Sequence, residues 1–217
     1  MNKLLLPILI ILSLPLVFQS TPTEILKLKI FDAFVTTPEQ SGNFVILNIT
    51  EEDVAREGGW PLPRRRLAEI QVDLINEGAV GVGWVMSFPQ PDRMGGDKIF
   101  AQTLSYAPSV LSVFESPNGK YPKTTGTVIL GEEVQGFISP GVVENIPPLS
   151  ESATHGISTA PVDVDQLVRR IPLLVKTPDG YASSFGTEVL KILTGTKTYI
   201  IKTNDNGIEE ISVKGIP

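Results

Sequence analysis

The stretch from Phe44 to Phe88 constrains the fold more than any other part of this sequence. A run that is apolar apart from Asn48 covers residues 44–49, and a second, mainly apolar run covers 80–88. Between the two runs, apolar residues follow the i, i+3, i+7, i+8 spacing of one helix face, at Leu67, Ile70, Leu74 and Ile75. Two apolar strands joined by a helix over this length predict a βαβ unit with parallel strands and a right-handed crossover.

The rest of the chain predicts additions to that sheet. A short helix over 97–107 precedes a third strand at 110–114. Turn sequences at 177–180 and 204–207 predict two antiparallel hairpins, with an amphipathic helix between them. The predicted fold class is therefore α/β, with a mixed, mainly parallel sheet, flanking helices and C-terminal antiparallel hairpins, preceded by an N-terminal membrane segment.

Composition narrows the class of function. The chain has 217 residues, 41% hydrophobic and 19% charged, which is typical of one globular domain of ordinary size. A net charge of −6 argues against nucleic-acid binding, which normally uses a basic surface. Because the chain has no cysteine and one histidine, a disulfide framework, a thiolate metal site and a multi-histidine metal site are all excluded. We expect no cofactor and no metal.

The N-terminus predicts a membrane segment. Lys3 precedes an apolar run from Leu4 to Phe18, which is typical of either an uncleaved signal anchor or a cleaved signal peptide over residues 1–22. The run is shorter than the roughly 20 residues that span a bilayer. Pro7 and Pro15 argue against a buried core helix. Both interpretations place one domain, residues 23–217, on the extracytoplasmic side of the cell membrane.

Ligands of open α/β sheets bind outside the carboxyl ends of the strands. On the predicted topology, these ends carry Thr50, Glu51 and Asp53 after the first strand, and Gln90 and Asp92 after the second. We expect these residues to be candidate ligand contacts. The alternative is that they are ordinary solvated loop residues.

Arginines at 64, 65 and 66 fall in the first turn of the predicted helix, where cations oppose the helix dipole. An anion bound at this terminus, or nearby Glu51 and Glu52, would relieve the conflict, so Arg64 is a candidate ligand residue. The alternative is that at least two of the arginines point to solvent or lipid headgroups. Trp60 is expected to pack between helix and sheet, with ligand stacking as the alternative.

Asp163 and Asp165 have the alternate spacing of a calcium-loop pair, but the later ligands of an EF-hand are missing. Arg169 and Arg170 follow closely and are alternative partners. His155 is expected in a loop, and without a Gly-x-Ser-x-Gly elbow it does not indicate a hydrolase triad. We expect no enzyme activity, although an envelope hydrolase using Glu51, Asp53 and Asp92 stays open.

Several motifs follow one another along residues 26–215: Leu28-Lys29-Ile30-Phe31-Asp32, Gly59-Trp60-Pro61-Leu62-Pro63-Arg64, Phe88-Pro89-Gln90-Pro91-Asp92, and Asp163-Val164-Asp165-Gln166-Leu167-Val168-Arg169-Arg170-Ile171-Pro172-Leu173. In this order they resemble the CHASE2 extracytoplasmic sensory domain. The resemblance implies a sensor outside the membrane. Relatives carry this domain ahead of further transmembrane helices and a cytoplasmic cyclase, histidine kinase or protein kinase.

The sequence departs from the family pattern at the two strand ends that often carry Asp, where Thr50 and Val85 stand. Gln166 replaces a usual Gly. A ligand or metal role of the Asp pair is therefore in doubt for this chain.

The leading hypothesis is a membrane-anchored extracytoplasmic sensor or ligand-binding domain without its own output domain, either truncated or acting through a partner. The alternative is a structural or interaction subunit of an envelope or virion assembly. The expected partners are the membrane, an unknown small ligand or an envelope protein, and a second copy in a homodimer. The candidate ligand-binding residues are Thr50, Glu51, Asp53, Trp60, Arg64, Gln90, Asp92, Asp163, Asp165 and Arg169.

Overall fold

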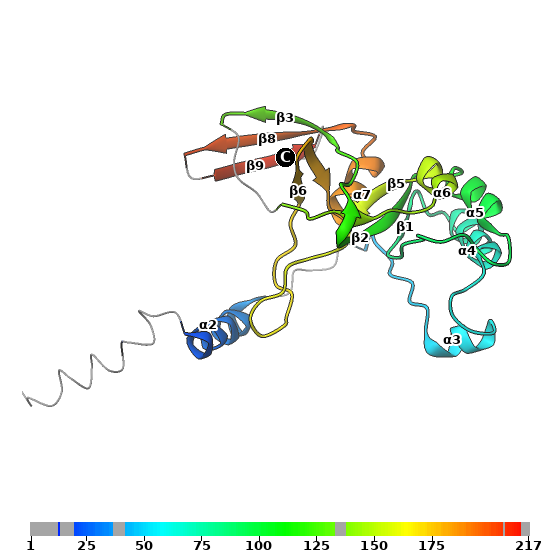
Figure 1. Cartoon of the computed structure of the whole chain (residues 1–217), viewed down its shortest axis with the longest axis horizontal. Helices are drawn as coiled ribbons and strands as arrows, with labels where there is room; N and C mark the ends of the chain where they lie inside the picture. The colour runs from blue at the N-terminus through cyan, green and yellow to red at the C-terminus, as the bar shows by residue number, and fades with distance from the viewer. Residues whose placement is uncertain (1–12, 14–19, 37–41, 133–137, 206, 214–217) are drawn as a thin grey trace, which may run out of the picture. The chain divides into compact units, whose positions relative to one another are not determined.

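A computed structural model describes residues 13, 20–36, 42–132, 138–205 and 207–213. The chain, which Figure 1 colours from the N-terminus to the C-terminus, divides into two compact units. The first unit is formed by residues 1–48 and 161–170, and the second by residues 49–160 and 171–217. Each unit is described by itself.

The first unit is built on helix α2 (Thr21–Phe34). Pro22 occupies its first turn, where a missing backbone N–H costs nothing because that group has no partner within a helix. Leu26, Ile30 and Phe34 follow one another at i, i+4 and i+8 and are all exposed, so one stripe of α2 is apolar and uncovered. The loop 161–170 lies beside the end of α2 (Figure 1).

The predicted strand at 44–49 is wrong. These residues have no regular secondary structure, and the side chains from Phe44 to Leu47 are exposed. A strand needs a hydrogen-bonding partner as well as an apolar sequence, and residues 44–48 belong to a different unit from the sheet. The helix after Trp60 therefore does not join two strands of a βαβ unit.

A βαβ unit is present, but it begins at the strand where the predicted unit was expected to end. It consists of β1 (Val82–Trp84), α5 (Asp97–Leu104) and β2 (Ser109–Lys120), with β1 and β2 parallel. Strand β5 (Thr154–Ile157) runs parallel to β2, and β4 (Val142–Val143) pairs antiparallel with the later part of β2. The predicted strand 80–88 is thus reduced to three residues, and β2 is the central strand of the sheet.

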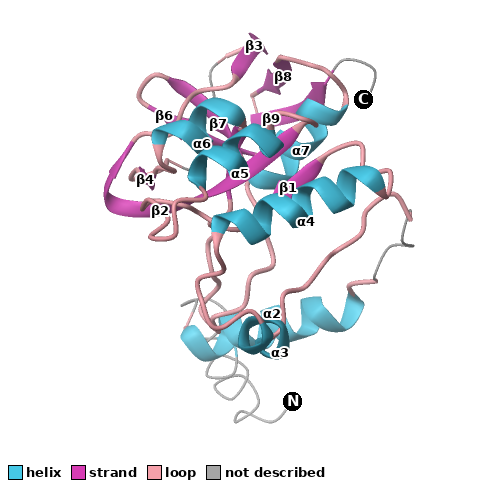
Figure 2. Cartoon of the chain, turned by 90° about the vertical axis from the view of Figure 1, so that its right-hand side faces the viewer, coloured by secondary structure: helices cyan, strands magenta, loops and turns pink. Residues whose placement is uncertain are grey.

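Helices cover both faces of this sheet. α4 (Arg64–Asn76), α5 and α6 (Pro147–Ser152) lie side by side in Figure 2. Trp84 points toward them and Gly83, next to it, points the other way. On that face α7 (Phe185–Leu193) approaches so closely that a Cβ on Gly156 would clash with the backbone of Phe185.

The predicted C-terminal hairpins are confirmed. β6 (Leu174–Thr177) and β7 (Gly180–Ser183) form the first, and β8 (Thr198–Asn204) and β9 (Gly207–Val213) form the second. β3 (Gly126–Leu130) adds to β8 in parallel and makes a three-stranded sheet. A mixed α/β fold with a parallel sheet, flanking helices and C-terminal antiparallel strands is therefore confirmed.

The core between α4, α5, α6 and the sheet contains a polar centre. Gln71 is fully buried, accepts a hydrogen bond from Trp84 Nε1 at 2.7 Å and donates one to Ser109 Oγ at 3.0 Å. Trp84 and Phe88 both meet the ring of Phe100 edge-on, with centroids 5.4 Å apart in each pair. These contacts fix α4 over the start of β2. The buried side-chain amide of Gln71 is shielded from water, so it would lose its hydrogen bonds if α4 moved.

The predicted membrane segment at 1–22 falls almost entirely outside the described residues. Among the helices that the structure describes, none has the length and apolar character needed to cross a membrane.

Candidate functional site

The most organised polar cluster lies in the first unit and consists of Asp32, Asp163, Asp165 and Arg169. We call it the Arg169 clasp. The guanidinium of Arg169 donates two hydrogen bonds of 2.8 Å to Asp32, and bonds of 2.8 and 2.7 Å to the two oxygens of Asp165. A further bond of 3.1 Å reaches Asp163. Only 6% of the Arg169 side chain is exposed, so a residue of the loop is enclosed by carboxylates from the loop and from α2.

The loop is folded to present these carboxylates inward. The backbone N–H of Asp163 donates to the carbonyl of Leu167 at 2.9 Å, and the N–H of Gln166 donates back to the carbonyl of Asp163. Gln166 takes a left-handed φ of +66°. A side chain in this conformation costs about 1 kcal/mol relative to Gly.

The Arg169 clasp is electrostatically matched. Hydrogen bonds from Arg169 lower the pKa of Asp165 to about 2 and hold the pKa of Asp32 below its usual range, because they favour the ionised carboxylates. Arg170 pairs with Asp163 at 3.3 Å. Asp163 and Asp165, whose spacing resembles that of a calcium-loop pair, therefore bind arginine, as in the alternative that the sequence offered. Among the residues that the structure describes, no group of carboxylates or histidines is arranged to hold a metal ion.

The first turn of α4 binds the chain's own carboxylate. Asp92 accepts hydrogen bonds from the backbone N–H groups of Arg64, Met94 and Gly96 at 3.0–3.1 Å. Burial alone would raise the pKa of Asp92, but these bonds and the charge of Arg64 lower it below the ordinary value. The anion expected at this terminus is therefore Asp92 itself, and neither Glu51 nor Glu52 supplies it.

The three arginines of this turn differ in their exposure and in their partners. The side chain of Arg64 is 10% exposed, lies over the ring of Phe88 at 4.3 Å and has its Nε 3.7 Å from Asp97. Arg66 forms ion pairs of 2.9 Å with Glu57 and Glu69. Arg65 alone of the three is exposed.

Within the described ranges, no hydrogen bond or ion pair joins the remaining candidate residues to Arg64 or Asp92. Thr50 and Asp53 form a capping box for the short helix α3 (Glu51–Arg56). The backbone N–H of Thr50 donates to the Asp53 carboxylate, and the backbone N–H of Asp53 donates to the Thr50 hydroxyl. Glu51 and Gln90 are exposed. Trp60 is 60% exposed, so the prediction that it packs between helix and sheet is wrong.

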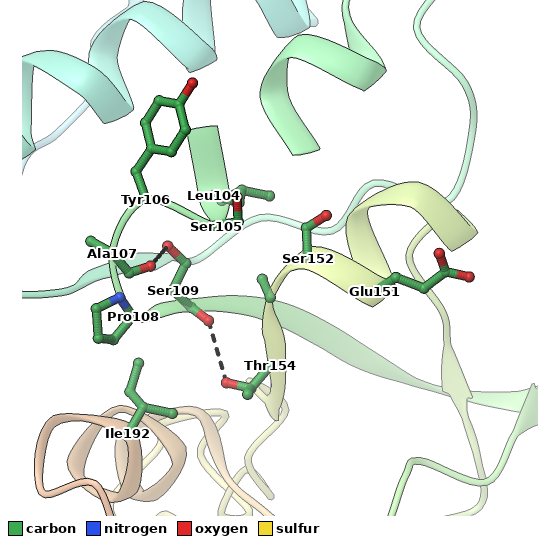
Figure 3. A pocket seen from close by; sticks show the side chains of 11 residues that line it. Leu104, Ser105, Tyr106, Ala107, Pro108, Ser109, Glu151, Ser152, Thr154 and Ile192 are labelled. Carbon is green, nitrogen blue, oxygen red and sulfur yellow. Dashed lines mark hydrogen bonds between the residues drawn. The ribbon is translucent and has the colours of Figure 1, made fainter. Parts of the chain in front are cut away.

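An open groove of about 490 Å³, which sequence reasoning missed, lies at the amino ends of β2 and β5 (Figure 3). We call it the amino-end groove. It is lined by residues 104–109, residues 151–154 and Ile192. The ends of α5 and α6 border it. The signal in the sequence is a set of hydroxyl residues immediately before and within two strands, which a search for carboxyl-end residues does not collect.

The prediction that His155 lies in a loop is wrong, because the residue lies on β5. Its Nε2 is buried and has no hydrogen-bond partner within the described part of the chain. It lines a small cavity of about 20 Å³, together with Lys123, Glu144 and Asn145. Burial and the charge of Lys123 lower the pKa of His155, so the imidazole is held neutral.

The described features define an α/β domain accompanied by an N-terminal helix that an arginine–carboxylate cluster fixes to a loop. The family model described as CHASE2 domain matches residues 7–214, nearly the whole chain. The chain therefore belongs to the CHASE2 family of sensory domains, which are typically extracytoplasmic. Among curated proteins and among solved structures, no significant match was found.

Proposed function

We propose that this chain is a membrane-anchored, extracytoplasmic ligand sensor that passes its signal through α2. The observation that carries the proposal is the Arg169 clasp. It connects the helix that follows the apolar N-terminal run with the loop between β5 and β6, 137 residues further along the chain. Bidentate arginine–carboxylate pairs restrict orientation as well as distance, so a displacement of the loop is transmitted to α2.

A ligand drives such a device only through its different affinity for two states. In the first state the Arg169 clasp is closed, as the structure shows. In the second, the loop is shifted and Asp32 is released. Tenfold preference of a ligand for either state moves the equilibrium tenfold, and the N-terminal segment carries the change toward the membrane.

The chain offers a clean test because it has no cysteine. Lys27 and Leu167 are exposed on α2 and on the loop, and replacing both by cysteine places two spin labels on the full chain without background labelling. We expect a narrow label-to-label distance distribution in electron paramagnetic resonance, and a broad one after Arg169→Ala. The matched control is Arg170→Ala, since Arg170 is 69% exposed and contacts Asp163 alone in this cluster. Equal distributions in the two variants would refute transmission through the clasp.

The proposed location has its own test. In intact cells, external protease should cleave the domain at residues 23–217, and cleavage only after lysis would contradict the anchored extracytoplasmic arrangement. The proposal includes no catalytic reaction, because Asp53 and Asp92 serve as caps of helices α3 and α4.

A second candidate function, an interaction subunit of an envelope assembly, is favoured by the exposed stripe on α2. Leu26, Ile30 and Phe34 are 59%, 52% and 81% exposed, an arrangement suited to a second copy or an envelope protein. Isolation of the native protein in a complex of fixed stoichiometry would support this function. Glu substitution of Ile30 should then dissociate the complex.

A further inference from the structure

The amino-end groove has the size of a small-molecule site. Its volume of about 490 Å³ lies within the range of roughly 300–1,000 Å³ usual for ligand pockets. Figure 3 shows Ser105, Ser152 and Thr154 around it, with Glu151 beyond Ser152 on the right and Ile192 below. Three hydroxyl residues therefore border this space, and the acidic residue Glu151 lies at its edge.

Three hydroxyl groups of the groove, those of Ser105, Ser152 and Thr154, already use their hydrogens in bonds to the backbone. Ser105 Oγ donates to the carbonyl of Gln102 at 2.7 Å, and Ser152 Oγ donates to the carbonyl of Pro148 at 2.9 Å. Thr154 Oγ1 donates to the carbonyl of Ser109 at 3.3 Å. A hydroxyl has a single hydrogen and two lone pairs. Each of these groups therefore offers a ligand only an acceptor.

The charges of the groove favour the same ligand chemistry. Glu151 lines it, and no Lys, Arg or His is among the described residues that do so. α5 ends at Leu104 and α6 ends at Ser152, and the carboxyl end of a helix carries partial negative charge. Acceptors, a carboxylate and helix carboxyl ends together match a ligand that is rich in donors and positively charged.

We propose that the amino-end groove binds a small organic cation through a primary ammonium group. An ammonium presents three donors and no acceptor, which complements a wall of acceptors. The assignment rests on the proposed function, because it names the chemical class of the stimulus that such a sensor detects. A neutral diol of the same length has donors but no positive charge, and an anion has neither, so both should bind more weakly than the ammonium ligand.

The test uses the full chain in detergent micelles and calorimetric titration with putrescine, 1,4-butanediol and succinate. Putrescine should bind, butanediol should bind at least about tenfold more weakly, and succinate should give no heat of binding, because charge-assisted hydrogen bonds are the stronger ones. Equal binding of putrescine and butanediol, or no binding of putrescine, would overturn the assignment.

Two variants locate the site. Glu151→Gln should weaken putrescine binding about tenfold. Ser152→Lys should abolish it, because it places a cation inside the groove. The matched control is Glu132→Gln, which removes the same charge from an exposed residue outside the groove lining and should leave binding unchanged. Equal losses in Glu151→Gln and Glu132→Gln would mean non-specific charge attraction and would refute the site.

Failure of this inference and failure of the proposed function are distinguishable. Binding of putrescine to solubilised protein requires neither a membrane nor α2. If putrescine binds but the spin-label distances are indifferent to Arg169→Ala, the groove assignment stands and the transmission proposal fails. If the distances depend on Arg169 and putrescine does not bind, the groove assignment fails alone.

Discussion

Replacing Asp92 tests whether this predicted ligand residue has a structural role instead. Its carboxylate accepts hydrogen bonds from three backbone N–H groups, and one of these belongs to Arg64, the first residue of α4. Loss of an N-cap costs about 1 kcal/mol, and two further charge-assisted bonds at a half-buried position add a similar amount each. We therefore expect Asp92→Ala to lower the free energy of unfolding by about 2–4 kcal/mol. Asp92→Asn keeps one acceptor oxygen and should cost about 1 kcal/mol.

The assay is urea unfolding followed by tryptophan emission. The chain has two tryptophans, and Trp60→Phe removes the exposed one, so that the signal reports Trp84 in the core that contains α4. Asp73→Ala changes an exposed acidic residue on the same helix and should stay within about 0.5 kcal/mol of the background. An Asp92→Ala variant as stable as this control would refute the capping argument.

The pH dependence of the free energy of unfolding of the same variants tests the direction of the Asp92 pKa shift. The folded-state pKa of Asp92 lies below the ordinary value of 3.8, so its contribution to stability is present above pH 3.8. It is lost as the pH falls through the folded-state pKa. Wild type and Asp92→Asn should therefore converge in stability in acid, and a constant difference across that range would contradict the assignment.

Three further predictions concern single residues. Gln71→Leu leaves the buried N–H of Trp84 without its acceptor and should cost about 1–3 kcal/mol in the urea assay, and a neutral result would refute the buried network. Gln166→Gly relieves a left-handed backbone and should raise the midpoint of thermal unfolding, whereas a lowered midpoint would contradict the strain. Burial lowers the folded-state pKa of His155, so stability should be full above pH 6.5 and fall as the pH decreases through that value. His155→Gln should remove this loss, and NMR titration of the one imidazole should give a pKa below 6.5.

Local signals predicted the elements whose causes are local. The apolar face at Leu67 and Ile70 lies on α4, and the turn sequences at 177–180 and 204–207 do form hairpins, because helix periodicity and turn conformation depend on neighbours in the chain. Membership of the CHASE2 family was likewise readable, because the order of several short motifs survives without any knowledge of their contacts.

The apolar run at 44–49 is an element that local signals predicted wrongly. Hydrophobicity and length predicted a strand, but a strand exists only where another backbone supplies hydrogen bonds, and residues 44–48 are not in the unit that contains the sheet. The partner of β1 proved to be the next strand along the chain, β2, with α5 as the crossover.

The sequence by itself determined the family, the helices and hairpins with local signals, and the residue types at each motif. Only the tertiary structure decided what those residues contact. Asp92 lies 28 residues from the helix end that it caps, and Asp32 lies 137 residues from Arg169. Ion pairs and caps over such separations depend on how the backbone returns on itself, and a linear pattern of charges carries no information about that path.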